Sequence, residues 1–231
     1  MSMTNYGDYI TLFNPDHIIY ILGLIIIGGV LFIKRDALKE DRSKITAAIL
    51  IVSVFQQILL YSSYYFILDF DLGESLPLQI SRVNSILGII FLITKNEKVF
   101  RLLALFGLFA WLSFLYPSRV YGITHPIGWS FFINHVVTLL LPFYGIIAYN
   151  MKIKTMDSLK VFPWFVLYVA VAYFVNMLTE GNYFYLKHKP IFAGLHDLFY
   201  IPLSLIFTLM LFMAGEWMYK KVQQTLHEPE S

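Results

Sequence analysis

Cysteine is absent from the 231-residue chain, and charged residues make up only 14% of it. Without cysteine there is no disulfide, no thiolate ligand for a metal and no cysteine nucleophile. A soluble domain usually carries more charge, about a quarter of its residues. Hydrophobic residues instead reach 58% of this sequence and aromatic residues 18%. The composition therefore predicts an all-α polytopic membrane protein.

Seven hydrophobic stretches cover most of the chain. Each is close to the length of about 20 residues that a helix needs to cross the hydrocarbon core of a bilayer. They lie at residues 17–34, 45–68, 77–95, 99–116, 128–149, 159–180 and 196–219. Ahead of them, residues 1–16 contain no lysine or arginine and no cleavage pattern, so we expect no signal peptide. Because no internal repeat is present, we expect a single seven-helix transmembrane domain over residues 1–231.

The basic residues fall mainly in alternate loops. Of the 17 lysine and arginine residues, 13 lie in the first, third and fifth loops and the C-terminal tail: Lys34, Arg35, Lys39, Arg42, Lys44, Lys95, Lys98, Arg101, Lys152, Lys154, Lys160, Lys220 and Lys221. The loops on the opposite side of the expected spans contain only Arg119, Lys187 and Lys189, and Arg82 lies inside the third span. Cytoplasmic loops are enriched in lysine and arginine. We therefore expect the N-terminus outside and the C-terminus in the cytoplasm.

Polar side chains gather at the outer ends of the third and fifth spans. The third enters the membrane as LPLQISRVNS, which brings in Gln79, Ser81 and Arg82. The fifth enters as GWSFFINH and carries Asn134 and His135. At the helical rise of 1.5 Å per residue, these groups lie about 6–10 Å below the outer surface. A histidine at the depth of a hydroxyl, an arginine and amides indicates a functional site, although a histidine that only bridges helices would give the same pattern.

Arg82 is costly within a membrane span, at about 2.5–3.5 kcal/mol at the bilayer centre and less near the interface. Such a residue persists when it faces the protein interior and finds an acceptor. Glu180 and Asp197 are the candidate partners, because both lie at the outer ends of their helices. The alternative is that Arg82 extends to lipid phosphates at the outer surface.

The segment GNYFYLKHKP, residues 181–190, is unusual for an outer loop. Its aromatic residues and lysines are typical of the headgroup level of a membrane. One interpretation is an ordinary aromatic belt with solvated lysines. The other is a lid that presents Lys189 to a phosphate or carboxylate and contributes to a substrate site. That site would also include the residues Asn176, Asn182, Tyr183 and Tyr185.

Three motifs carry a family resemblance. The stretches LPLQIS at 76–81, FFINH at 131–135 and N…GNYFYLKHKP at 176–190 resemble the YwaF family of bacterial integral membrane proteins. That family is distantly similar to a vertebrate transmembrane acyltransferase that remodels ether phospholipids. The resemblance covers roughly residues 76–205 and implies a multi-pass protein of the cell membrane, the cytoplasmic membrane of a bacterium.

The resemblance also implies a catalytic pair. The vertebrate relative is thought to use a cysteine and a membrane histidine, whose counterparts here are Ser81 and His135. The family's first motif usually reads like LPLHLC, so Gln79 stands in place of its histidine and Ser81 in place of its cysteine. A serine serves as a nucleophile only with a stronger base than a cysteine needs. Two readings stay open: a hydroxyl-based variant of the chemistry, or a relative that has kept the pocket without catalysis.

These features favour acyl transfer or ester hydrolysis on an outer-leaflet lipid. His135 would take the proton from Ser81, and Arg82 or Lys189 would hold the lipid phosphate. A membrane lipid is the expected partner, and no cofactor, metal or nucleic acid is expected. The candidate donors to the oxyanion are the amides of Asn134, Asn176 and Gln79.

Two other functions are compatible with the same residues. The first is a transporter or binding subunit with an outward-facing polar pocket, against which stands the apolar cytoplasmic half of the spans. The second is a zinc hydrolase that uses His135, His196, Asp197 or Glu180. Zinc needs at least three convergent protein ligands, and only two histidines lie in or next to the spans, so this reading ranks lowest.

The loop charges predict which positions are accessible from outside. Single cysteines introduced into this cysteine-free chain at Asn5, Ser75 or Thr124 should react with an impermeant thiol reagent in intact cells. Cysteines at Ser43 or Thr155 should react only after the cells are opened. Labelling of the second pair in sealed cells would reverse the orientation.

Overall fold

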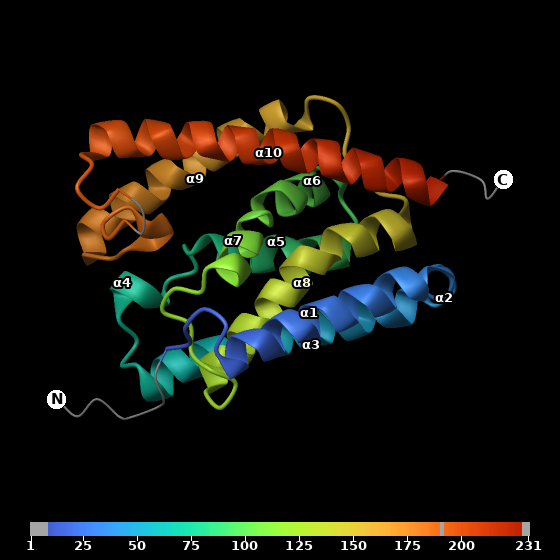
Figure 1. The fold of residues 1–231 in the computed structure, drawn as a ribbon, viewed down its shortest axis with the longest axis horizontal. Coiled ribbons are helices and arrows are strands. Elements are labelled where there is room, and N and C mark those ends of the chain that lie inside the picture. The colour runs from blue at the N-terminus through green and yellow to red at the C-terminus, as the bar shows by residue number, and fades with distance from the viewer. Residues whose placement is uncertain (1–8, 190–191, 228–231) are drawn as a thin grey trace.

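The computed structural model describes residues 9–189 and 192–227, and the part that it describes is built from helices (Figure 1). An isolated bridge pairs Tyr9 with Tyr121. The helices are α1 (Pro15–Ile33), α2 (Arg35–Glu40), α3 (Arg42–Ile67), α4 (Leu72–Ser75), α5 (Ile80–Thr94), α6 (Glu97–Phe106), α7 (Phe109–Leu115), α8 (Pro126–Tyr149), α9 (Asp157–Thr179), the 3₁₀ turn η1 (Tyr183–Tyr185) and α10 (Asp197–His227).

Within the described residues, six helical segments are long and apolar enough to cross a membrane. They are α1, α3, the pair α6–α7 taken together, α8, α9 and α10. The chain is therefore an all-α multi-pass membrane protein. The expected span at 99–116 corresponds to α6–α7, but the helix is interrupted at Gly107 and Leu108. This break was not expected, because Arg101 and Ser113 are the only polar or charged residues in the run apart from its terminal tyrosine.

The expected third span, 77–95, forms a shorter helix than the other six. Helix α5 has 15 residues and reaches about 22 Å, less than the roughly 30 Å of a hydrocarbon core. It begins at Ile80 because Pro77 disfavours helical geometry at Leu76, which is extended. Seven crossings therefore remain a prediction.

Helix α8 lies at the centre of the bundle. It packs against α1, α3, α5, α6 and α7, and most of its residues are buried. Gly145 makes one of these contacts possible, since a Cβ there would lie 2.7 Å from the ring of Phe100. In Figure 1, α9 and α10 run along one side of this centre, and α1 and α3 run along the other.

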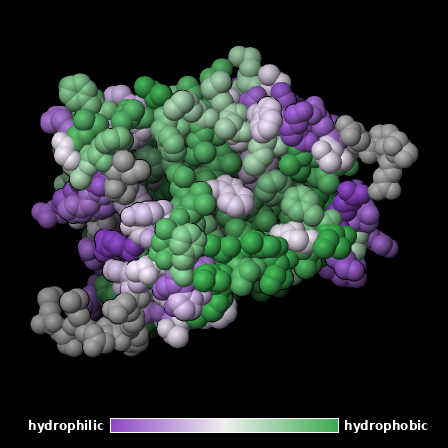
Figure 2. Space-filling model, in the orientation of Figure 1, coloured by the Kyte–Doolittle hydropathy of each residue, from purple (hydrophilic) through white to green (hydrophobic). Residues whose placement is uncertain are grey.

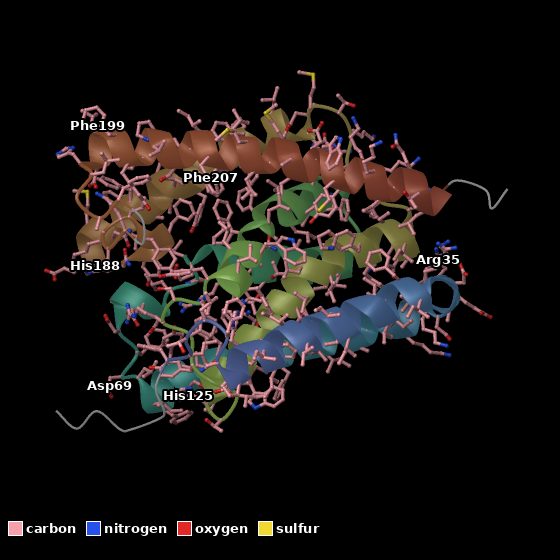
Figure 3. All side chains as sticks on the ribbon, viewed as in Figure 1. Arg35, Asp69, His125, His188, Phe199 and Phe207 are labelled. Carbon is pink, nitrogen blue, oxygen red and sulfur yellow. The ribbon has the colours of Figure 1, made fainter. Side chains whose placement is uncertain are left out.

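The surface is apolar in the middle and polar at both ends, as Figure 2 shows. Residues such as Ile25 and Ile51 are more than 60% exposed, which suits contact with lipid rather than water. Figure 3 places Asp69, His125 and His188 at the end of the molecule that contains α4, and Arg35 at the opposite end.

The structure bears on the proposed labelling positions. Thr124, Ser43 and Thr155 are exposed, and they form the usable set. Ser75 was expected in an open loop, yet it is fully buried, so a cysteine there would be shielded on either side. Asn5 lies outside the described residues.

Candidate functional site

A cavity of about 220 Å³ opens at the α4 end of the bundle, between α3, α5, α8 and the α6–α7 segment. Seven of the site residues expected from the sequence line it: Gln79, Ser81, Arg82, Asn134, His135, Asn182 and Tyr185. The other three, Asn176, Tyr183 and Lys189, do not. The polar groups from the third and fifth spans thus meet in one space.

His135 is buried in α8, and its ring packs against that of Phe131 with centroids 3.9 Å apart. Nδ1 of His135 lies 2.8 Å from the backbone carbonyl oxygen of Phe131. A carbonyl oxygen only accepts hydrogen bonds, so Nδ1 carries the proton in the neutral ring. Nε2 is therefore left with its lone pair, which is the form that a general base needs.

Ser81 is the second residue of α5 and is half-buried at the edge of the same cavity. Within the described residues, its hydroxyl forms no hydrogen bond to His135 or to another side chain. Catalytic hydrogen bonds are often long before a substrate binds. Ser81 lies at the N-terminus of α5, where the preceding N-cap residue, Gln79, provides no side-chain cap. The free N–H groups of this helix end create a positive local potential.

The amides of the cavity fall into two groups. Asn134 is paired within the protein: Nδ2 donates to the backbone oxygen of Ser81 at 3.4 Å, and Oδ1 accepts from the Thr138 hydroxyl at 3.2 Å. Asn84 differs, because neither of its amide atoms has a partner among the described residues, although its side chain is only 2% exposed. Leaving a buried amide unpaired costs about 1–3 kcal/mol. Asn84 belongs to the motif LPLQISRVNS, but sequence reasoning gave it no role.

Arg82 has other partners than those expected. Its guanidinium donates to the backbone oxygens of Glu74 and Leu76, the latter at 2.9 Å, and to the hydroxyl of Tyr64. It also lies over the Tyr64 ring, 4.7 Å from the centroid. The expected ion pair with Glu180 or Asp197 is not formed within the described residues. Backbone oxygens at the end of α4 and just before α5 take the place of those carboxylates, so Arg82 joins this segment to α3.

The segment after α9 is held by the protein itself. Asn176 donates through Nδ2 to the backbone oxygen of Tyr183 at 2.9 Å and accepts from its N–H at 2.7 Å. The Tyr183 hydroxyl donates to the backbone oxygen of Leu72 at 2.5 Å. Asn176 and Tyr183 therefore fasten this segment to α9 and α4. Only Asn182 and Tyr185 reach the cavity from it, and Pro190, the last residue of its motif, lies outside the described residues.

Lys189 is also engaged away from the cavity. Its ammonium lies 2.7 Å from a carboxylate oxygen of Asp197 and donates to the backbone oxygen of Leu195 at 2.6 Å. It lies 5.0 Å from the centroid of the Tyr200 ring. These contacts fix the start of α10.

A different cation lines the mouth of the cavity. Arg119 forms an ion pair with Glu74 at 2.6 Å, and it is hydrogen-bonded to Tyr9. The Arg119 side chain is 55% exposed, and its φ of 55° is unusual for a residue other than glycine. Because all three side chains line the cavity, the mouth is a polar and charged rim.

A buried polar network continues from the cavity toward the centre of the bundle. Gln56 Nε2 donates to the Ser130 hydroxyl at 2.8 Å, and Gln57 Nε2 donates to the Ser85 hydroxyl at 2.8 Å. Gln57 also donates to Gln56 Oε1 at 2.6 Å. Sequence reasoning missed the two glutamines, although two adjacent amides within the apolar run VFQQIL were a signal.

The residues considered for a zinc site do not come together. His135 lines the cavity, whereas His196 and Asp197 lie at the start of α10, away from it. Among the residues described, no group of three or more histidine and acidic side chains could hold a metal ion.

The contacts of Arg82 predict a structural role that can be measured. Arg82→Ala removes the donors of two backbone oxygens and a phenol, so we expect a loss of about 3 kcal/mol in unfolding free energy. Chemical unfolding in detergent would measure it. Arg119→Ala is the matched control, because an exposed ion pair contributes about 1 kcal/mol or less. Equal stability of the two variants would contradict this role for Arg82.

Comparison with known proteins identifies the family. The model of the TMEM164 family matches residues 12–219, which include all the cavity-lining residues except Tyr9. No curated protein and no solved structure matches the chain. Since the match extends over most of the sequence, the chain belongs to the TMEM164 family of membrane proteins.

Proposed function

We propose that the protein is an integral membrane enzyme that transfers an acyl group from an outer-leaflet lipid, or hydrolyses it, through Ser81 and His135. The observation that carries the proposal is that one cavity contains both residues, with His135 held in the tautomer of a base by Phe131. The TMEM164 family is linked to lipid acyl transfer. The motif resemblance to the YwaF family and, distantly, to a vertebrate phospholipid acyltransferase gives further support.

The proposed reaction has two steps. The Ser81 oxygen attacks the ester carbonyl, its proton passes to Nε2 of His135, and the carbonyl electron pair moves onto oxygen. Collapse of this intermediate breaks the bond to the lipid alkoxide, which takes the proton from His135 and leaves as a lysolipid. An acceptor hydroxyl, or water, then gives its proton to His135 and attacks the acyl-serine. The second collapse returns the proton to Ser81.

The surroundings of the pair favour a more acidic nucleophile than serine. His135 is oriented by a carbonyl group and not by a carboxylate, so no negative charge stabilises the imidazolium that forms. The N-terminus of α5 favours negative charge at residue 81. A cysteine thiolate would gain from this more than a serine.

The headgroup phosphate fits best at the mouth of the cavity. Arg82 is largely occupied by backbone oxygens and Lys189 by Asp197, whereas Arg119 is exposed and lines the cavity. We propose that a lipid phosphate takes the place of Glu74 on Arg119. A guanidinium binds phosphate through two parallel hydrogen bonds.

This arrangement requires the cavity to face outward. We place the N-terminus outside and the C-terminus in the cytoplasm of a bacterial cell, in one seven-helix domain that includes α5. The basic loops support this orientation, and Arg35 lies at the end opposite His125 and His188 (Figure 3).

A binding or transport pocket without chemistry is the second candidate. The observation that favours it is the glutamine network, which carries polar groups from the cavity toward the bundle centre. Gln56 lies 11 residues from the end of α3 at Ile67, about 16 Å along the helix.

The first test concerns the catalytic pair. Ser81→Ala and His135→Ala should each abolish acyl release from phospholipid vesicles that contain the purified protein, measured by mass spectrometry. The double variant should be no worse than either single one, because residues that act as a unit are not additive. Ser113→Ala is the control, since Ser113 lines the same cavity. Full activity of Ser81→Ala would exclude the covalent mechanism and favour the binding pocket.

Ser81→Cys extends this test, because it restores the residue usual in the resembling family. The variant should retain activity and should accumulate a hydroxylamine-sensitive thioester at residue 81, since a thiol is intrinsically more nucleophilic. It should also become sensitive to small thiol reagents. Ser113→Cys should form no thioester.

The second test concerns Arg119. Arg119→Ala should raise KM for a phospholipid about tenfold with little change in kcat, because a ground-state contact is lost. Arg119→Lys should restore part of the affinity. Lys187→Ala is the control: Lys187 lies in the same outer region but does not line the cavity. An unchanged KM in Arg119→Ala would argue against phosphate binding at this rim.

A further inference from the structure

Asn84 is a buried amide without a partner in a cavity that opens to the surface. Its side chain is 2% exposed, it lines the cavity, and neither Nδ2 nor Oδ1 has a hydrogen-bond partner within the part of the chain that the structure describes. Buried polar groups in folded proteins are nearly always paired, so an exception calls for an explanation. A ligand that enters the cavity would supply the missing partner.

The position of Asn84 relates it to Ser81. The two residues are three apart on α5, so they share a face, and Asn84 lies about 4.5 Å deeper along the helix. On the other side is Gly107, where a Cβ would lie 3.0 Å from Nδ2 of Asn84 and 3.2 Å from the backbone oxygen of Thr138. The absence of a side chain at the α6–α7 break therefore lets the Asn84 amide pack close to the backbone of Gly107.

The other amides expected at the site already donate within the protein. Asn134 donates to the backbone of Ser81, Asn176 to that of Tyr183, and Gln79 to that of Asn182 at 3.4 Å. Asn84 differs from them because neither of its N–H groups donates a hydrogen bond within the part of the chain that the structure describes. It thus meets the requirement for an oxyanion donor better than the three residues that the sequence indicated.

We propose that Asn84 binds the ester carbonyl of the lipid and that its Nδ2–H stabilises the oxyanion. Stabilisation of the oxyanion rests on the proposed function, whereas binding of the ester carbonyl does not. When the Ser81 oxygen bonds to the carbonyl carbon and its proton moves to His135, the electron pair shifted onto the carbonyl oxygen receives the hydrogen bond of Asn84. This electron pair re-forms the carbonyl bond as the bond to the leaving alkoxide breaks. Oδ1 of Asn84 accepts from the hydroxyl or water that enters for the second step.

Binding can be tested without turnover. The probes are a diester phosphatidylcholine and its diether analogue, which has the same chains but no carbonyl group. Their affinities for the purified protein would be measured by thermal stabilisation in detergent. We expect the wild type to bind the diester about three- to tenfold more tightly, and Asn84→Leu to bind both equally. Ser113→Ala should keep the preference. A preference that persists in Asn84→Leu would overturn the proposal.

Kinetic measurements test whether Asn84 stabilises the oxyanion. Asn84→Leu should lower kcat about 100- to 1,000-fold with little change in KM for the diester, because the donor acts on charge that develops in the transition state. The same variant should unfold at a higher temperature than the wild type, since an unpaired amide is removed. A structural asparagine would give the opposite result, with lower stability and nearly normal kcat.

The outcomes separate this proposal from the proposed function. An inactive wild type that still prefers the diester would refute acyl transfer and retain Asn84 as a carbonyl-binding residue. An active wild type whose kcat and ester preference survive Asn84→Leu would retain acyl transfer and refute the role of Asn84. An inactive wild type without the preference would refute both.

Discussion

The guanidinium of Arg82 is the interaction on which the candidate site depends. Helix α4 ends at Ser75 and the chain is extended at Leu76, so the backbone oxygens of Glu74 and Leu76 lack the partners of a continuous helix, although Leu76 accepts from the N–H of Leu78. Arg82 donates to both oxygens and also to the hydroxyl of Tyr64 on α3. Because Ser81 is the preceding residue, the same contacts fix its position at the cavity. The buried charge of Arg82 is costly by itself, but its hydrogen bonds stabilise the non-helical backbone between α4 and α5.

The sequence predicted the helical architecture more accurately than it predicted the contacts between side chains. Apolar length is a local property, so six of the seven expected stretches reappear as long helical segments and the seventh as α5. The same reasoning brought Ser81 and His135 to one end of the bundle, where they line one cavity. It did not foresee the break at Gly107, where the side chain of Asn84 on α5 and the backbone of Thr138 on α8 approach closely.

Which polar residues are already paired could not be read from the sequence. Asn134, Asn176 and Asn84 are all asparagines, and each lies near one end of a hydrophobic stretch. The backbone of Tyr183 satisfies Asn176, whereas nothing among the described residues satisfies Asn84. The difference arises from the relative register of helices distant in sequence, which no local pattern encodes. In this bundle, pairing separates residues that hold the structure together from those available to a ligand.

The short length of α5 has a consequence for the surrounding bilayer. Ile86, Ile90 and Ile93 are 39%, 40% and 65% exposed, so lipid contacts one face of a helix that is about 8 Å shorter than the hydrocarbon core. A bilayer responds to such hydrophobic mismatch by thinning next to the protein. Thinning on the side of the α4 end would bring the glycerol region of the adjacent lipids closer to the level of Ser81. Membrane thickness, set by the length of the acyl chains, would thereby control how readily a lipid reaches the cavity.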